Sequence, residues 1–117
     1  MLTKTFKNFD IFKHRRDQLV NHAPDGAFLL YSGDETHLGS FRGESSFVYL
    51  TGFEEPNSWA VILTGKPSRC ILFVRPKDPQ LERWDGERFG PELAQKEFLV
   101  DECQSIEKME SMLPQLL

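Results

Sequence analysis

The sequence of 117 residues has the length of one domain, and its hydrophobic fraction of 39% is sufficient for one core. A net charge of −4 argues against nucleic-acid binding, which needs a clustered basic surface. No apolar run approaches the ~20 residues that cross a bilayer, and the first ten residues lack the apolar segment of a secretion signal. With two unpaired cysteines, Cys70 and Cys103, these features predict a cytoplasmic protein that binds neither nucleic acid nor membrane.

The chain begins with a predicted helix and a predicted strand. Apolar residues recur at three- and four-residue steps from Phe9 to Val20, which is typical of one helix face, and the stem of Arg16 lies at its edge. The sequence Pro-Asp-Gly at 24–26 predicts a turn. The continuous apolar run at 27–31 then predicts a buried strand.

The next segment, "FRGESSFVYLTGFEEP" at 41–56, is too apolar for a solvated loop. Ser45 or Ser46 can cap a short helix, with Phe47 and Leu50 three residues apart on its buried face. Gly52 is placed to end that helix in a left-handed conformation. A strand fits the periodicity nearly as well.

Two buried strands are predicted at 59–63 and 70–74, and the short link between them predicts an antiparallel hairpin. Pro76 and Pro79 end the second strand, and a charged loop follows at 81–90. Trp84 lies in this loop. It either packs back on its own domain or belongs to a partly exposed recognition surface.

The remaining elements are a helix starting at Pro91, a short strand at 98–100, and a last helix capped by Ser105. Pro114 is expected to kink or end that last helix near Leu113. The alternation of helices and strands predicts an α/β layer architecture with a mixed sheet.

No residue pattern in this chain predicts a catalytic centre. The histidines lack metal-ligand spacing, and no nucleophile motif or phosphate-binding glycine loop is present. The acidic residues at 78–87 alternate with arginines, which favours an ion-paired loop over a pair of catalytic carboxylates. Arg42 has a planar guanidinium that can hold backbone carbonyls or a ligand carboxylate. We therefore expect no catalytic residue, no metal ligand and no cofactor in residues 1–117.

Three blocks of the sequence resemble one family. They are Phe41-Arg42-x-x-Ser45-x-Phe47-x-Tyr49-Leu50-Thr51-Gly52-Phe53-x-Glu55-Pro56, Glu82-x-Trp84-x-Gly86-x-Arg88-x-Gly90, and the opening Phe12-Lys13-x-Arg15-Arg16-x-x-Leu19. Taken in chain order, they resemble the N-terminal domain of aminopeptidase P, an Xaa-Pro aminopeptidase of the pita-bread metallopeptidase clan. The resemblance covers essentially the whole chain.

The resemblance implies the creatinase/prolidase N-terminal fold, a ribonuclease H-like mixed β-sheet flanked by helices, here in a shortened form. It implies a parent enzyme that removes an N-terminal residue preceding proline. In that family, two divalent metal ions, often manganese, are held by a C-terminal domain that is absent here. The implied partners are that catalytic domain, further copies in a homo-oligomer, and a peptide substrate with proline second.

The resemblance also implies roles for single residues. The tryptophan that matches Trp84 lies near the active-site mouth of family members, helps form the substrate pocket and sometimes reaches a neighbouring subunit. The other matched positions are expected to be structural: Arg42, Ser45, Phe47, Tyr49, Leu50, Gly52, Gly86 and Gly90. At 43–44 the chain has Gly-Glu where the family more often has Gln-Asn or Gln-Asp, which argues against ligand contacts from that loop.

The leading hypothesis is thus a non-catalytic N-terminal domain that contributes to oligomerisation and to the pocket mouth. A second hypothesis is a non-enzymatic protein-binding module derived from the same fold. A third is the N-terminal domain of a prolidase-type dipeptidase or creatinase-type hydrolase. The blocks at 49–56 and 82–90 favour aminopeptidase P over the third.

Overall fold

The fold is a four-stranded mixed sheet with helices on both faces. The computed structural model describes residues 8–34 and 43–117. Within these ranges the elements are α1 (Asn8–His22), β1 (Ala27–Tyr31), α2 (Ser45–Thr51), β2 (Trp59–Leu63), β3 (Arg69–Val74), α3 (Pro79–Asp85), α4 (Gly90–Glu97), β4 (Glu102–Ser105), the 3-10 helix η1 (Ile106–Lys108) and α5 (Met109–Leu116). The predicted α/β class with a mixed sheet is confirmed.

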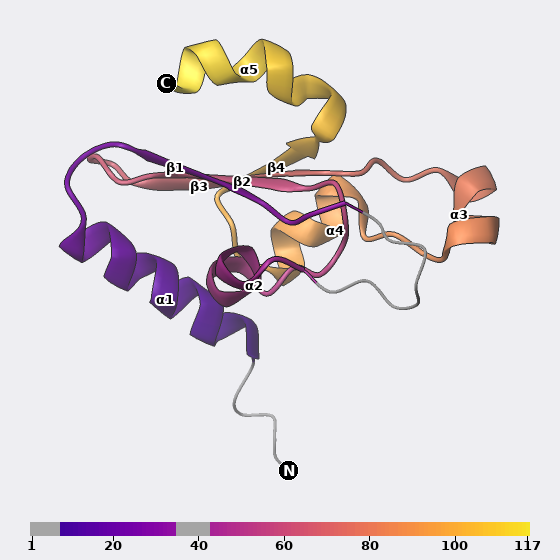
Figure 1. The fold of residues 1–117 in the computed structure, drawn as a ribbon, viewed down its shortest axis with the longest axis horizontal. Coiled ribbons are helices and arrows are strands. Elements are labelled where there is room, and N and C mark those ends of the chain that lie inside the picture. The colour runs from indigo at the N-terminus through magenta and orange to yellow at the C-terminus, as the bar shows by residue number, and fades with distance from the viewer. Residues whose placement is uncertain (1–7, 35–42) are drawn as a thin grey trace.

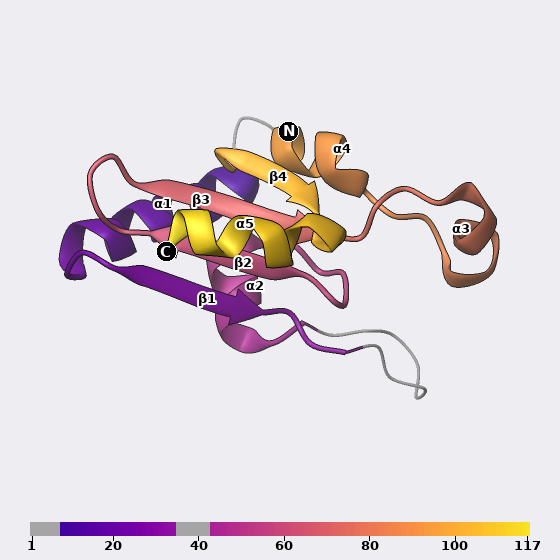
Figure 2. The same ribbon diagram turned by 90° about the horizontal axis from the view of Figure 1, so that it is seen from above.

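The strands lie in the order β1-β2-β3-β4. β1, β2 and β3 pair antiparallel, whereas β4 pairs parallel to β3, with Leu72 opposite Cys103. The predicted antiparallel hairpin of β2 and β3 is therefore confirmed. Helices α1, α2 and α4 cover one face of the sheet and α5 covers the other (Figures 1 and 2).

Alternate residues of the central strands supply two hydrophobic cores, because successive side chains of a strand point to opposite faces. On the α1 side, Ile62 and Leu72 pack with Phe47 and Phe53. On the α5 side, a smaller core contains Val61, Ile71 and Phe73. Apolar residues of η1 and α5 pack on it: Ile106, Met109, Met112, Leu113 and Leu116. The apolar face predicted for the last helix is thus the face that packs on the sheet.

Helix α2 forms where the segment at 41–56 predicted it, but its cap is a different residue. The Glu44 carboxylate, not the hydroxyl of Ser45 or Ser46, accepts a hydrogen bond of 3.0 Å from Phe47 N. Glu44 precedes the helix in extended conformation, so both serines fall inside the first turn. Phe47 is fully buried, and Gly52 ends the helix at φ 72°.

β1 has the predicted bounds, but the prediction that it is buried is wrong. Phe28 and Leu29 are 36% and 40% exposed. β1 is the first strand in the sheet order and pairs with β2 alone, so only one side of it is covered. The apolar run at 27–31 therefore forms a strand at the edge of the sheet and not a central strand.

Three further predictions on the C-terminal half are wrong. Residues 79–85 form α3 instead of a charged loop. Residues 98–99 form a turn, with Leu99 at φ 55°, and the strand lies later, at β4. Helix α5 continues past Pro114 to Leu116, because the proline removes one hydrogen bond near the helix end while Leu113 and Leu116 still pack on the sheet.

Candidate functional site: the α3 arm

Residues 76–89, which we call the arm, project beyond the sheet between β3 and α4. Both ribbon views show α3 standing apart from the layers formed by the sheet and the other helices (Figures 1 and 2). The arm contains the second block of the family resemblance, including Trp84 and Gly86. These two features make the arm the candidate functional site.

The tip of the arm exposes apolar side chains. Trp84 is 87% exposed and Leu81 is 46% exposed. They are three residues apart in α3 and thus lie on one helix face. Of the two alternatives for Trp84, packing on its own domain is wrong. An exposed indole beside a leucine is typical of a surface that contacts another molecule.

Helix α3 has clear start and stop signals. The Asp78 side chain accepts hydrogen bonds from Gln80 N and Leu81 N at 3.2 and 3.3 Å, and Pro79 occupies the first turn. Gly86 ends the helix at φ 101°, a conformation that favours glycine, and its N–H donates to Glu82 O at 3.1 Å. The predicted structural role of Gly86 is consistent with this geometry.

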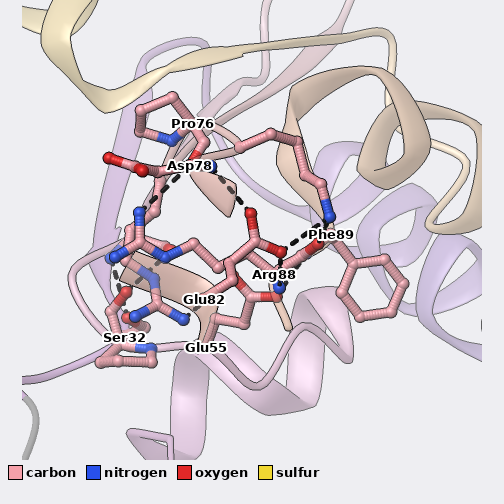
Figure 3. A network of polar contacts seen from close by, with 11 residues as sticks. Ser32, Glu55, Pro76, Asp78, Glu82, Arg88 and Phe89 are labelled. Carbon is pink, nitrogen blue, oxygen red and sulfur yellow. Dashed lines mark hydrogen bonds and ion pairs between the residues drawn. The ribbon is translucent and has the colours of Figure 1, made fainter. Parts of the chain in front are cut away.

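The Glu82 carboxylate accepts three hydrogen bonds at the base of the arm (Figure 3). Oε1 accepts from Lys77 Nζ at 2.8 Å and from Arg88 N at 2.9 Å, and Oε2 accepts from Asp78 N at 2.7 Å. The Lys77 ammonium, followed by the Arg88 N–H, lowers the pKa of Glu82 to about 2. Glu82 is therefore ionised at neutral pH and bonded to both the outgoing and the returning chain.

Two further contacts join the outgoing and returning chain. Lys77 Nζ donates to Arg88 O at 2.8 Å, and Arg88 Nη1 donates to Pro76 O at 3.1 Å. Gly90, at φ 77°, permits this approach, because a Cβ there would lie 2.5 Å from Lys77 Cγ. A glycine at 90 is thus required by both its conformation and its neighbour.

The buried carboxylate of Glu55 connects the arm to the body of the domain. Oε2 accepts from Phe89 N at 2.8 Å, and Oε1 pairs with Arg75 Nη2 at 3.4 Å (Figure 3). The Phe89 ring packs against Phe53 and Phe98, with ring centroids 5.7 and 5.1 Å away. The arm therefore starts and ends at residues fixed in the core.

The residues predicted from the first resemblance block lie elsewhere, at α2. Tyr49 is exposed, and the Arg15 guanidinium stacks 4.2 Å from its ring centroid. Leu50 is half-buried and packs on the main core. A surface hollow of about 600 Å³ lies beside these residues and Ser45. Among the residues of this block that the structure describes, 43–56, none forms a hydrogen bond or ring contact with Trp84.

Arg42, for which the sequence predicts contacts with backbone carbonyls or a carboxylate, lies outside the described residues. Arg16 makes such contacts instead. Its Nη1 donates to Leu50 O at 2.9 Å, and its Nη2 donates to Phe98 O and Leu99 O at 3.1 and 2.9 Å. The sequence feature that points to this role of Arg16 is its position within the apolar face of a predicted helix.

The described residues do not form a metal site. Within 8–34 and 43–117, no group of three or more His, Cys, Asp and Glu side chains is placed to hold a metal ion. His14 and His22 are exposed, and His37 lies outside these ranges. These described residues do not fit the metal pair that the resemblance implies. No helix in the described part has the length and apolar character to cross a membrane.

Comparison with known proteins identifies the family. The profile described as "Aminopeptidase P, N-terminal domain" matches residues 12–117, which include both the arm and α2. The chain belongs to this family. As a member of the aminopeptidase P N-terminal family, it is 40% identical over 113 residues to the Xaa-Pro aminopeptidase of Haemophilus influenzae, covering 91% of this chain. It is 42% identical over 82 residues to the human Xaa-Pro aminopeptidase 3, covering 66% of this chain.

Solved structures confirm the fold of this aminopeptidase P N-terminal domain. Aminopeptidase P from Escherichia coli with the inhibitor Pro-Leu superposes with a TM-score of 0.87 at 29% identity, over 95% of this chain. The zinc-substituted form of that enzyme in complex with product gives 0.86. The chain covers 27% of each solved chain and 26% of the Haemophilus relative. It therefore corresponds to about a quarter of these relatives.

Proposed function

We propose that this domain is the non-catalytic part of an Xaa-Pro aminopeptidase, an enzyme that removes an N-terminal residue preceding proline. The relatives that carry that activity in their names are about four times longer than this chain. The described residues hold no set of metal ligands, so we place the two divalent metal ions of the enzyme in a C-terminal catalytic domain. We propose that these ions are manganese. The domain alone is then inactive, and we place the enzyme in the cytoplasm.

Within this enzyme, the arm brings Trp84 to the mouth of the substrate pocket. The observation that carries this proposal is an indole that is 87% exposed at the end of a hydrogen-bonded arm. Indole is flat, apolar and rigid, so it can cover one side of a proline ring without a large loss of side-chain entropy. An arm that extends beyond its own domain reaches a pocket formed by other residues.

The exposed tip also supports a role in oligomerisation. Leu81 and Trp84 form an apolar surface that a second copy can bury. The pocket that receives Trp84 then belongs either to the same chain or to a neighbouring copy. Sedimentation of the complete protein and of Trp84→Ala measures this contribution, and a smaller assembly in the variant supports it.

The test is the activity of the complete protein carrying Trp84→Ala. We expect kcat/KM for an Xaa-Pro peptide to fall roughly ten- to a hundredfold, because positioning of the substrate is lost, with no change in thermal stability. Leu29→Ala, an apolar residue on β1 that is 40% exposed, is the matched control and should retain full activity. An unchanged rate in Trp84→Ala removes this residue from the pocket. Hydrolysis of Xaa-Pro peptides by residues 1–117 alone with manganese contradicts the non-catalytic assignment.

A further inference from the structure

We propose that Glu82 is the positioning residue for Trp84: its carboxylate holds the outgoing and returning chain of the arm together and so fixes the place of the indole. The inference rests on the proposed function of Trp84. It extends that function to a residue that does not touch the substrate.

The first argument is the length of α3. A helix of seven residues is too short to be stable in water by itself, because helix nucleation is unfavourable and few hydrogen bonds follow it. The Trp84 side chain is 87% exposed, so it buries little surface against the domain and does not hold the helix in place. The orientation of α3 must therefore come from contacts at its base.

The second argument is the direction of the Glu82 side chain. Glu82 is two residues from Trp84 in α3, but its side chain is only 10% exposed and points to the base of the arm (Figure 3). Three donors converge on it: the Lys77 ammonium and the Asp78 N–H before the helix, and the Arg88 N–H after it. These charge-assisted hydrogen bonds are stronger than neutral ones.

The third argument is that the contacts of Glu82 are local. The three donors to its carboxylate, Lys77, Asp78 and Arg88, lie within the arm, and none belongs to the sheet or the two cores. Removal of the carboxylate thus loosens the arm and leaves the fold of the domain intact. Two hydrogen bonds between the outgoing and returning chain would remain, from Lys77 to Arg88 O and from Arg88 to Pro76 O, against the three that the carboxylate accepts.

A double-mutant cycle in the complete protein tests the inference. Glu82→Ala should lower kcat/KM for an Xaa-Pro peptide by roughly the same ten- to a hundredfold as Trp84→Ala. In the Trp84→Ala background, Glu82→Ala should cause no further loss, because a residue that acts through Trp84 has nothing left to position. Equal losses in both backgrounds overturn the inference. Glu110→Ala, which removes a carboxylate from the exposed surface of α5, is the control and should leave activity unchanged.

A spectroscopic measurement on the 117-residue chain separates this inference from the proposed function. In a Trp59→Phe background, Trp84 is the single tryptophan, and its fluorescence anisotropy reports motion of the arm. We expect Glu82→Ala to lower the anisotropy, Glu82→Gln to restore part of it through the two Oε1 contacts, and Glu110→Ala to leave it unchanged. Unchanged anisotropy in Glu82→Ala overturns the inference. If anisotropy falls while Trp84→Ala has full activity, the proposed function fails and the positioning of the arm stands.

Discussion

The guanidinium of Arg16 on α1 donates a 2.9 Å hydrogen bond to the carbonyl of Leu50 at the end of α2. The same side chain, which is 4% exposed, also reaches the carbonyls of Phe98 and Leu99 after α4. One planar group thus donates to carbonyls at the ends of two helices.

We predict that Arg16→Lys destabilises the domain by about 2–4 kcal/mol, because a lysine ammonium lacks the planar fork that donates to all three carbonyls, so buried hydrogen bonds are lost. The neighbouring Arg15→Lys is the matched control, since Arg15 donates to Tyr49 O from a less buried position. It should cost no more than about 0.5 kcal/mol. Urea unfolding followed by circular dichroism measures both, and equal costs would contradict the role given to Arg16.

Gly52 is predicted to be intolerant of a side chain. At φ 72°, an added Cβ would lie 2.4 Å from Phe12 Cε2, so Gly52→Ala combines backbone strain with a clash. We expect a loss of about 2–4 kcal/mol in unfolding free energy. In a Phe12→Ala background the additional cost of Gly52→Ala should fall, because the clash is relieved. Gly65→Ala, with no atom within 4 Å of the added Cβ, should be close to neutral.

The two thiols are predicted to be unreactive in the folded protein. Burial raises the pKa of Cys70 to about 11 and that of Cys103 to about 12. At pH 8 a thiol reagent should label neither cysteine in the native chain and both in denaturant. Fast native labelling at the rate of a free thiol would contradict the burial of these side chains.

The same shifts give a pH dependence of stability. The raised pKa of Cys70 means that the folded state favours the protonated thiol. The resulting stabilisation is fully present below the unfolded pKa of about 9 and is lost as pH rises toward about 11. The melting temperature should therefore decrease between pH 9 and 11, and Cys70→Ala should reduce that slope.

Phe28 and Ile62 are paired across β1 and β2, and they differ in burial. Ile62 is 1% exposed in the main core, whereas Phe28 is 36% exposed at the sheet edge. Ile62→Ala should cost about 2–5 kcal/mol, as for other buried aliphatic residues, and Phe28→Ala clearly less. Denaturant unfolding of both variants provides the comparison, and an equal cost would show that β1 is covered in solution.

The sequence was most informative for elements that local patterns determine. The hairpin of β2 and β3 follows from two apolar runs and a short polar link, and α2 follows from Phe47, Leu50 and Gly52. Helix α3 is not predicted although Asp78-Pro79 is a valid start signal, because the interleaved charges that follow are equally typical of a solvated loop. Its exposed Trp84 could then have been placed on a helix instead of a loop.

Long-range contacts were beyond the reach of sequence patterns. The partners of Arg16 lie up to 83 positions away, and the Glu55–Phe89 contact spans 34 positions. The left-handed conformation of Leu99, which moves the last strand to 102–105, is rare for a leucine and is imposed by the surrounding fold. The arm's hydrogen bonds at Glu82 are likewise visible only once the chain is folded back on itself.

The sequence separation of the Arg16 contacts has a consequence for biosynthesis. Helix α1 is the first described element to leave the ribosome, but two of the carbonyls that receive its guanidinium belong to Phe98 and Leu99. Until residue 99 has been translated and released from the exit tunnel, Nη2 of Arg16 lacks these two acceptors and α1 lacks its final anchor. The anchoring of the first helix is thus completed late, even though the nascent chain presents that helix early.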